Sequence, residues 1–352
     1  MQKINSGVTA PKGFLAGGVH CGVKTNNTAK KDIAIIYSEK PCTAAAVYTQ
    51  NKVFGAPITV TRRNIADGMA QAVVCNSGNA NTCNADGVEK AEKMCILAAE
   101  ALHLKPEDII VASTGVIGQV LPIEPIEKGI AALAPIISRE GNLDAVQAIM
   151  TTDTKPKEEA YEIEIGGKTV KIGAMAKGSG MIHPNMATML SVVLCDAQVE
   201  ASVWQKMLRD AVELTFNRVT VDGDTSTNDT LYGLANGASG VSASDEESFK
   251  ALSAALTSVL GDLAYMLVKD GEGASKVARI HVAGAASDAD AERVARTVGH
   301  SQLVKTALYG RDANWGRIAA AVGRSGADFN PDDVVVTLCG VELFRKGQPT
   351  DL

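Results

Sequence analysis

The chain has 352 residues, enough for one large domain or two moderate ones, and 46% of them are hydrophobic, so a sizeable core can be buried. The formal net charge is −6, and no run of lysine or arginine forms the basic patch that nucleic acid or anionic lipid would need, so we expect small-molecule partners. Because no apolar stretch approaches about 18 residues and the N-terminus lacks a signal-peptide core, we expect a cytoplasmic protein.

The first half of the chain alternates β-branched runs with helical patterns. The predicted strands cover residues 32–39, 43–50, 70–75 and 108–114, with a turn at Pro41 between the first two. Apolar side chains at helical spacing predict helices over 87–103, 124–137 and 142–151. Two alternating runs around Gly166-Gly167 predict a β-hairpin over 161–178.

The second half begins with a predicted strand that ends at Cys195. The later predictions are helices over 201–215, 248–268, 288–297 and 314–323, and strands over 278–284 and 333–340. Meanders and alternations are mixed without a regular βαβ rhythm, which favours a layered α+β fold. No linker composition marks a domain boundary.

The seven cysteines are odd in number and far apart, and most lie in apolar runs, so we expect reduced, buried thiols. There is no CxxC pair and only five scattered histidines, so we expect no metal site. The acidic stretch DGDTSTND lacks the glutamate of a calcium loop, and we interpret it as a hydrogen-bonded turn near the functional site.

The segment KGSGMIHPNMATML places Ala187 and Thr188 in front of a buried strand. A threonine hydroxyl is a poor nucleophile unless a base removes its proton. If the peptide bond before Thr188 is cut, the new α-amine, with a reference pKa of about 7.7 to 8.0, can be that base. Gly178 and Gly180 permit the tight backbone that self-cleavage needs. The alternative is that Thr188 merely begins a strand.

The turn ASTGVIG follows the predicted strand 108–114. The hydroxyl of Thr114 and the backbone N–H of Gly115 could donate hydrogen bonds to an oxyanion there. The alternative is an ordinary strand-to-loop turn.

The segment KGSGMIHPNMATML resembles the signature of the ornithine acetyltransferase (glutamate N-acetyltransferase) family of arginine biosynthesis. Other segments are similar to the same family in the same order: PKGFLAGGVHCGVK, VVCNSGNANTC, ASTGVIG, VDGDTSTNDT, KDGEGASK and GRDANWGRI. The resemblance runs from about residue 10 to the end. It implies a layered αββα-like sandwich of the self-cleaving N-terminal-nucleophile type.

The resemblance also implies a reaction. Self-cleavage between Ala187 and Thr188 would give interleaved α (1–187) and β (188–352) chains, which assemble as a dimer of α/β pairs. The acetyl group of N-acetylornithine would pass to Thr188 and then to glutamate, with Thr114 and Gly115 as oxyanion donors. No cofactor or metal is implied, and acetyl-CoA stays open as a second acetyl donor.

The resemblance gives substrate-binding roles to Thr151, Lys177, Thr188 and Glu272. The Lys177 ammonium could pair with the α-carboxylate that acetylornithine and glutamate share. Glycines on both sides of Glu272 let the backbone present its carboxylate. Without the resemblance, the ordinary interpretation is favoured at each position: a solvated surface lysine, a helix-terminal charge at Glu272 and a helix-end residue at Thr151.

Family chains continue beyond GVELFRKGQPTDL, with an Asn and a Thr that close over the substrate, whereas this sequence stops before them. Two other interpretations stay open. One is an N-terminal-nucleophile amidase or aminopeptidase that gives its acyl group to water. The other is an inactive, uncut ligand-binding protein.

Overall fold

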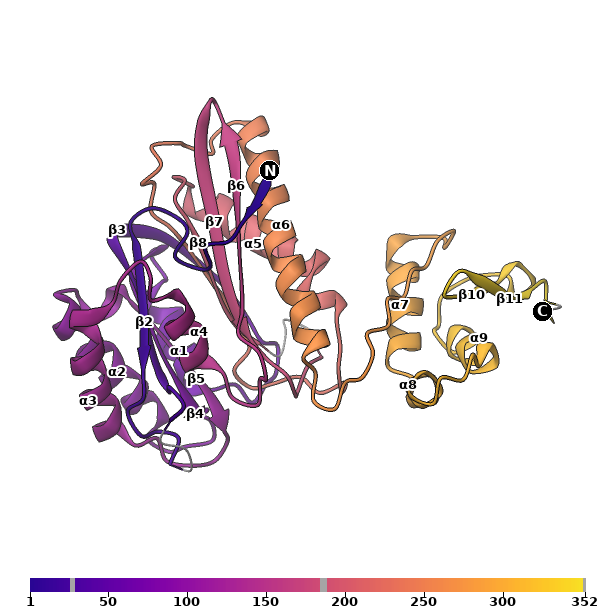
Figure 1. Ribbon diagram of the computed structural model, residues 1–352, viewed down its shortest axis with the longest axis horizontal. Coiled ribbons are helices and arrows are strands. Elements are labelled where there is room, and N and C mark those ends of the chain that lie inside the picture. Colours follow the sequence, from indigo (N-terminus) through magenta and orange to yellow (C-terminus); the bar gives the residue numbers. More distant parts are fainter. Residues whose placement is uncertain (26–28, 184–188, 351–352) are drawn as a thin grey trace. The chain divides into compact units, whose positions relative to one another are not determined.

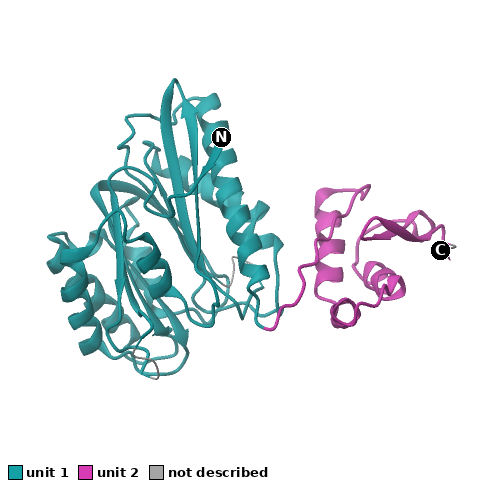
Figure 2. Cartoon of the chain, in the orientation of Figure 1, with its two compact units in different colours: residues 1–272 teal, residues 273–352 magenta. Residues whose placement is uncertain are grey.

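The computed structural model describes residues 1–25, 29–183 and 189–350. The chain forms two compact units, residues 1–272 and 273–352 (Figure 2). The boundary follows Glu272, where no change in sequence composition had marked it. Every residue of the predicted site belongs to the first unit.

The first unit is built on one mixed sheet with the strand order β1-β6-β7-β8-β9-β3-β4-β5, and β2 pairs with β3 (Figure 1). Its strands are β1 (Gln2–Ile4), β2 (Phe14–Val19), β3 (Ile33–Tyr48), β4 (Met69–Asn79), β5 (Ile109–Val116), β6 (Lys157–Ile165), β7 (Lys168–Lys177), β8 (Leu190–Cys195) and β9 (Thr230–Ala235). The predicted hairpin is confirmed, because β6 and β7 pair antiparallel across Gly166-Gly167.

Strand β3 belongs to both halves of this sheet. Its first part pairs with β2 and β4, and its second part pairs with β9. The predicted turn at Pro41 is therefore wrong, since Pro41 lies inside one long strand. The proline is accommodated by a register irregularity between Tyr37 and Cys42, where the ladder with β4 is interrupted and no hydrogen bond from its nitrogen is needed.

The helices of the first unit are α1 (Ala56–Asn64), α2 (Gly87–Leu102), α3 (Ile123–Leu133), α4 (Asn142–Ile149), α5 (Ala201–Leu214) and α6 (Glu246–Lys269). Helices α5 and α6 cover one face of β6 to β9, and α1 to α3 cover the far face of β3 to β5. A third core, which includes α4, lies between the two halves of the sheet. These helix, sheet, sheet and helix layers confirm the predicted sandwich (Figure 1).

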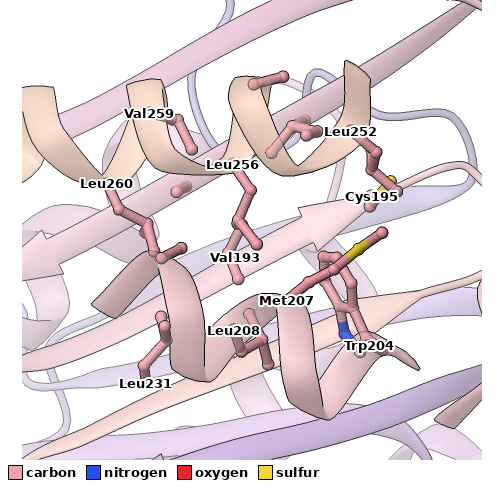
Figure 3. Packing of buried hydrophobic residues seen from close by; sticks show 14 of the residues in the cluster. Val193, Cys195, Trp204, Met207, Leu208, Leu231, Leu252, Leu256, Val259 and Leu260 are labelled. Carbon is pink, nitrogen blue, oxygen red and sulfur yellow. The ribbon is translucent and has the colours of Figure 1, made fainter. Parts of the chain in front are cut away.

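Strand β8 shows how sequence alternation builds these layers. Leu190, Val192 and Leu194 face the central core, while Val193 and Cys195 face the helices. Figure 3 shows Val193 between side chains of α6, such as Leu256, and side chains of α5, such as Leu208. Each such fully buried aliphatic side chain contributes about 1.5 to 3 kcal/mol through loss of apolar surface from water.

From the sequence we expected no segment long and apolar enough to span a membrane. Helix α6 differs from this expectation, because by length and composition alone it could cross one. Its apolar residues Leu252, Leu256, Leu260 and Leu263 are buried against the sheet and α5 (Figure 3). Asp245 caps its first turn, accepting a hydrogen bond from the Ser248 N–H at 2.8 Å.

The second unit contains α7 (Asp288–Gly299), α8 (Gln302–Tyr309), α9 (Trp315–Gly323) and a small antiparallel sheet of β10 (Val335–Leu338), β11 (Val341–Arg345) and β12 (Gln348–Pro349). The predicted strand over 278–284 is wrong: this segment joins no ladder within the described residues, and Val277 and Ile280 are exposed. A β-branched run forms a strand only where a partner strand accepts its hydrogen bonds.

All seven cysteines are free thiols. Four are buried (Cys42, Cys75, Cys95 and Cys195), as expected, whereas Cys83 and Cys339 are exposed. Burial raises the pKa of Cys42, Cys75 and Cys95 to about 12, so these thiols stay protonated and unreactive at neutral pH.

Candidate functional site

The candidate site begins at the end of β5, where Thr114 and Gly115 lie. Gly115 has a φ of +135° and pairs with Gly78 of β4. A Cβ at this position would come within 2.3 Å of the Gly78 carbonyl carbon, so only glycine fits. Close approach of the two strands therefore fixes the turn, with Thr114 half-buried and Gly115 exposed at its tip.

Lys177 brings three of the predicted residues together. It ends β7, and its Nζ donates hydrogen bonds to Thr151 Oγ1 at 2.6 Å and to Thr114 Oγ1 at 3.3 Å. Its register partner on β8 is Leu190, two positions beyond Thr188 in sequence. Thr114 and Thr151, which are 63 and 26 positions from Lys177 in the chain, thus contact it at the end of β7. This end of β7 pairs with β8, the strand that follows the predicted nucleophile.

Lys177 as a residue is only 9% exposed, and this burial decides its electrostatics. Burial lowers the pKa of Lys177, while the nearby carboxylates of Asp153 and Asp229 act in the opposite direction. A cation held in so dry a setting has few competing water molecules. It is therefore suited to binding a carboxylate brought in by a ligand.

Asp153 is a buried carboxylate that the sequence analysis missed. Its Oδ2 accepts a hydrogen bond from the Thr151 N–H at 3.0 Å, and its Oδ1 accepts one from the Gly178 N–H at 2.6 Å. Burial works against its charge, but the Lys177 and Lys157 ammoniums outweigh burial and lower the pKa of Asp153. The aspartate thus stays ionised beside Lys177, with 4.0 Å between Oδ2 and Nζ.

Glu272 lies just after α6 and beside the loop that follows Lys177. Its N–H donates to the Ser179 carbonyl at 2.9 Å. Its carboxylate lies against Gly180, where a Cβ would meet Glu272 Oε1 at 2.5 Å. Glu272 is exposed and therefore open to a ligand. It contacts the loop after Lys177, not Lys177 itself.

The acidic turn after α5 holds the residues that precede the predicted cleavage point. Asp222 accepts hydrogen bonds from the Met181 N–H at 2.6 Å and the Ile182 N–H at 2.9 Å, and Thr225 Oγ1 donates to the His183 carbonyl. Met181 has a φ of +58°, an uncommon value for a side chain of this kind. The interpretation of this stretch as a hydrogen-bonded turn near the site is confirmed.

Lys24 is a second residue that sequence reasoning missed. Its Nζ donates to the Lys31 carbonyl at 2.7 Å and to the Met150 carbonyl at 2.8 Å, next to Thr151. Burial, with a smaller effect from the Lys177 charge, lowers the pKa of Lys24 to about 8. Its motif gave a signal, because PKGFLAGGVHCGVK is one of the segments that carry the resemblance.

The predicted cleavage residues Ala187 and Thr188 lie outside the described residues. The structure places what flanks them: Ile182 and His183 are held by the acidic turn, and the Met189 carbonyl accepts a hydrogen bond from the Thr230 N–H at 2.9 Å. The site therefore combines hydroxyls, a buried cation and an exposed carboxylate around the end of β7. Such a set can bind an amino acid through its charged groups.

Comparison with known proteins agrees with the motif resemblance. The ArgJ family profile matches residues 15–352. The arginine biosynthesis bifunctional protein ArgJ of Nitratidesulfovibrio vulgaris is 56% identical over 97% of this chain and 87% of its own length. The ArgJ protein of Symbiobacterium thermophilum is 51% identical over 99% of this chain and 88% of its own.

A crystal structure of ornithine acetyltransferase complexed with ornithine, from Mycobacterium tuberculosis, is 34% identical, with a TM-score of 0.49 over 54% of this chain and 99% of that one. The sequence matches alone decide the assignment, since the profile and the curated relatives each span nearly the whole chain. This chain belongs to the ArgJ family.

Proposed function

We propose that this chain transfers the acetyl group of N2-acetyl-L-ornithine to L-glutamate through an ester on Thr188, within arginine biosynthesis. The observation that carries the proposal is the Lys177 ammonium, which donates to both Thr151 and Thr114 at the end of β7. Membership of the ArgJ family supports the same reaction. The two substrates share an α-carboxylate, which Lys177 is suited to bind.

The proposed nucleophile arises by autoproteolysis of the Ala187–Thr188 peptide bond. The hydroxyl of Thr188 attacks the Ala187 carbonyl, and water then hydrolyses the resulting ester to give α (1–187) and β (188–352) chains. The freed α-amine of Thr188, with a reference pKa of about 7.7 to 8.0, takes the hydroxyl proton in each later turnover. The segment around Asp222 supports this step because it holds the backbone of Met181 and Ile182, which precede the bond in sequence.

Each acetyl transfer passes through a tetrahedral oxyanion. The Thr188 oxygen bonds to the acetyl carbon, the C–N bond to ornithine breaks, and the proton held by the α-amine goes to the leaving amine. The amine of glutamate then attacks the ester, and Thr188 recovers its proton. We assign the Thr114 hydroxyl and the Gly115 N–H as oxyanion donors, of which one is typically worth about 2.7 to 4 kcal/mol of barrier.

Glu272 completes the proposed substrate site. Its exposed carboxylate would attract the second ammonium of ornithine, while Lys177 and Thr151 hold the α-carboxylate end. We further propose that no metal or cofactor is needed and that acetyl-CoA can serve as a second donor, in line with the bifunctional name of the relatives. A dimer of α/β pairs in the cytoplasm is the proposed assembly.

The test is a comparison of the purified wild-type protein with the Thr188→Ala variant. We expect mass spectrometry to find two chains, one beginning Thr-Met-Leu. We expect about one equivalent of ornithine per cleaved chain from N-acetylornithine alone, and repeated turnover only when glutamate is present. Thr188→Ala should stay as one chain and release none. Thr169→Ala, at an exposed position near the start of β7, is the matched control and should behave as wild type. Repeated turnover without glutamate, with acetate as the product, would instead indicate an amidase.

A further inference from the structure

Lys157 is a buried cation that the proposed reaction does not use. It is the first residue of β6 and only 2% exposed. Its Nζ lies 2.7 Å from Asp153 Oδ1 and 2.5 Å from Asp270 Oδ2. A buried ammonium is unfavourable unless it is paired, and here two carboxylates from segments over 100 residues apart supply the pairing.

The ion pair between Lys157 and Asp153 connects Lys157 to the part of the site that would bind a carboxylate. Asp153, which Lys157 contacts, also accepts hydrogen bonds from the Thr151 and Gly178 N–H groups. One of these N–H groups belongs to Thr151 itself, and the other belongs to Gly178, the residue after Lys177. Asp153 thus holds the backbone at both ends of the hydrogen bond between Lys177 and Thr151. The position of Asp153 therefore sets the position of Lys177 relative to Thr151.

The ion pair between Lys157 and Asp270 connects Lys157 to the segment that carries Glu272. The Asp270 carboxylate also accepts from the Thr154 N–H at 3.0 Å, and the Asp270 carbonyl accepts from Ser179 Oγ at 2.6 Å. The Glu272 N–H then donates to the Ser179 carbonyl at 2.9 Å. Through Asp270, the backbone that carries Glu272 is tied to the loop after Lys177.

We propose that Lys157 is a positioning residue that fixes the distance between Lys177 and Glu272, and so sets how tightly an amino acid with charged groups at both ends is bound. The inference rests on the proposed function. Among the described residues, the ion pairs of Lys157 are with Asp153 and Asp270 and not with Lys177 or Glu272. Lys157 therefore acts on Lys177 and Glu272 through these two aspartates.

The chain offers a matched control in Lys3, which also bridges two carboxylates: Glu159 at 2.8 Å and Asp262 at 3.1 Å. The Lys3 side chain is 51% exposed, and none of these three residues contacts the site residues described above. Lys157→Met and Lys3→Met therefore make the same chemical change in two bridges, of which only one leads to the site.

The experiment measures KM and kcat, per cleaved chain, for N-acetylornithine and for glutamate. For Lys157→Met we expect KM to rise roughly tenfold or more for both substrates while kcat changes far less, because binding groups are misplaced and the reacting hydroxyl is not. Lys157→Arg, which keeps the charge, should recover part of this loss. Lys3→Met should leave both constants unchanged.

A merely structural role would lower the active fraction and leave KM as in wild type, and that result would overturn the inference. If Lys157→Met does not fold, Asp270→Asn decides in its place: a raised KM supports the inference, and an unchanged KM overturns it. Wild-type protein that transfers no acetyl group would refute the proposed function instead. The two failures are thus distinguishable.

Discussion

Two lysines on neighbouring strands make the same kind of contact but differ in their exposure to water. Lys3 on β1 and Lys157 on β6 each bridge two carboxylates, and β1 and β6 pair directly. Water reaches half of the Lys3 side chain but only 2% of Lys157. Water screens an exposed pair and makes it dispensable, whereas a buried pair must be complete, because an unpaired buried charge is costly.

The largest effect is expected where the buried bridge loses a carboxylate. Asp153→Ala leaves Lys157 with one carboxylate partner and removes the acceptor of the Thr151 and Gly178 N–H groups. We expect the free energy of unfolding to fall by about 3 to 5 kcal/mol, measured by urea denaturation. A loss below about 1 kcal/mol would show that the two bridges do not differ.

The next effect concerns binding rather than stability. In Gly180→Ala the new methyl would lie 2.5 Å from Glu272 Oε1, and the flexible glutamate side chain must move away. We expect KM for N-acetylornithine to rise about tenfold, roughly 1.4 kcal/mol of binding, with stability almost unchanged. Gly323→Ala, whose methyl meets no atom within 4 Å, is the control and should keep the wild-type KM.

The pH dependence of stability should separate the two bridges. Burial opposes ionisation of Asp270, but hydrogen bonds from Lys157 and Thr154 lower its pKa, so its contribution is present above the unfolded pKa of about 3.9 and is lost as pH falls through the folded value. Burial likewise opposes the charge of Lys3, but its hydrogen bonds to Glu159 and Asp262 raise its pKa. Its contribution is present below the unfolded pKa of about 10.4 and is lost as pH rises through the folded value.

The measurement for this separation is the unfolding free energy of two variants across the pH range. Asp270→Asn should flatten the acid limb and leave the alkaline limb, and Lys3→Met should do the reverse. Parallel curves for wild type and Asp270→Asn below pH 4 would contradict the assignment.

The smallest effect is expected for Lys3→Met. An exposed bridge is worth at most about 1 kcal/mol, and added salt should remove most of that difference, since the Debye length falls to about 3 Å at 1 M. Urea denaturation with and without salt measures it. A salt-independent loss would mean that the exposed bridge behaves like the buried one.

Periodicity predicted the parts of the fold that a single segment determines. The hairpin of β6 and β7 and the helices α2, α5 and α6 follow from apolar spacing within 10 to 25 residues. The predictions were wrong where pairing with distant segments of the chain decides the secondary structure. The local sequence around Pro41 predicts a turn. Strand β3 nevertheless continues through Pro41, because it pairs with β4 before the proline and with β9 after it. The pattern of residues 278–284 predicted a strand, but among the residues that the structure describes this segment joins no ladder.

The candidate site shows the same division. Resemblance of short motifs identified Thr114, Thr151, Lys177 and Glu272, and the structure brings the first three into hydrogen-bond contact. It did not identify Lys157, because its partner Asp270 is 113 positions away and no local pattern encodes that pairing. The local sequence KEEAYEIEI gave no signal, since Lys157 is one of several charged residues in that strand.

The sheet order has a consequence for any protein in which the Ala187–Thr188 bond is cut. Strands β8 and β9 follow that bond in sequence, yet in the sheet they lie between β7 and β3, which precede it. Each fragment alone would carry open strand edges, and such edges invite aggregation. We expect the two pieces to be obligate companions, insoluble when produced apart and recovered only by complementation when produced together.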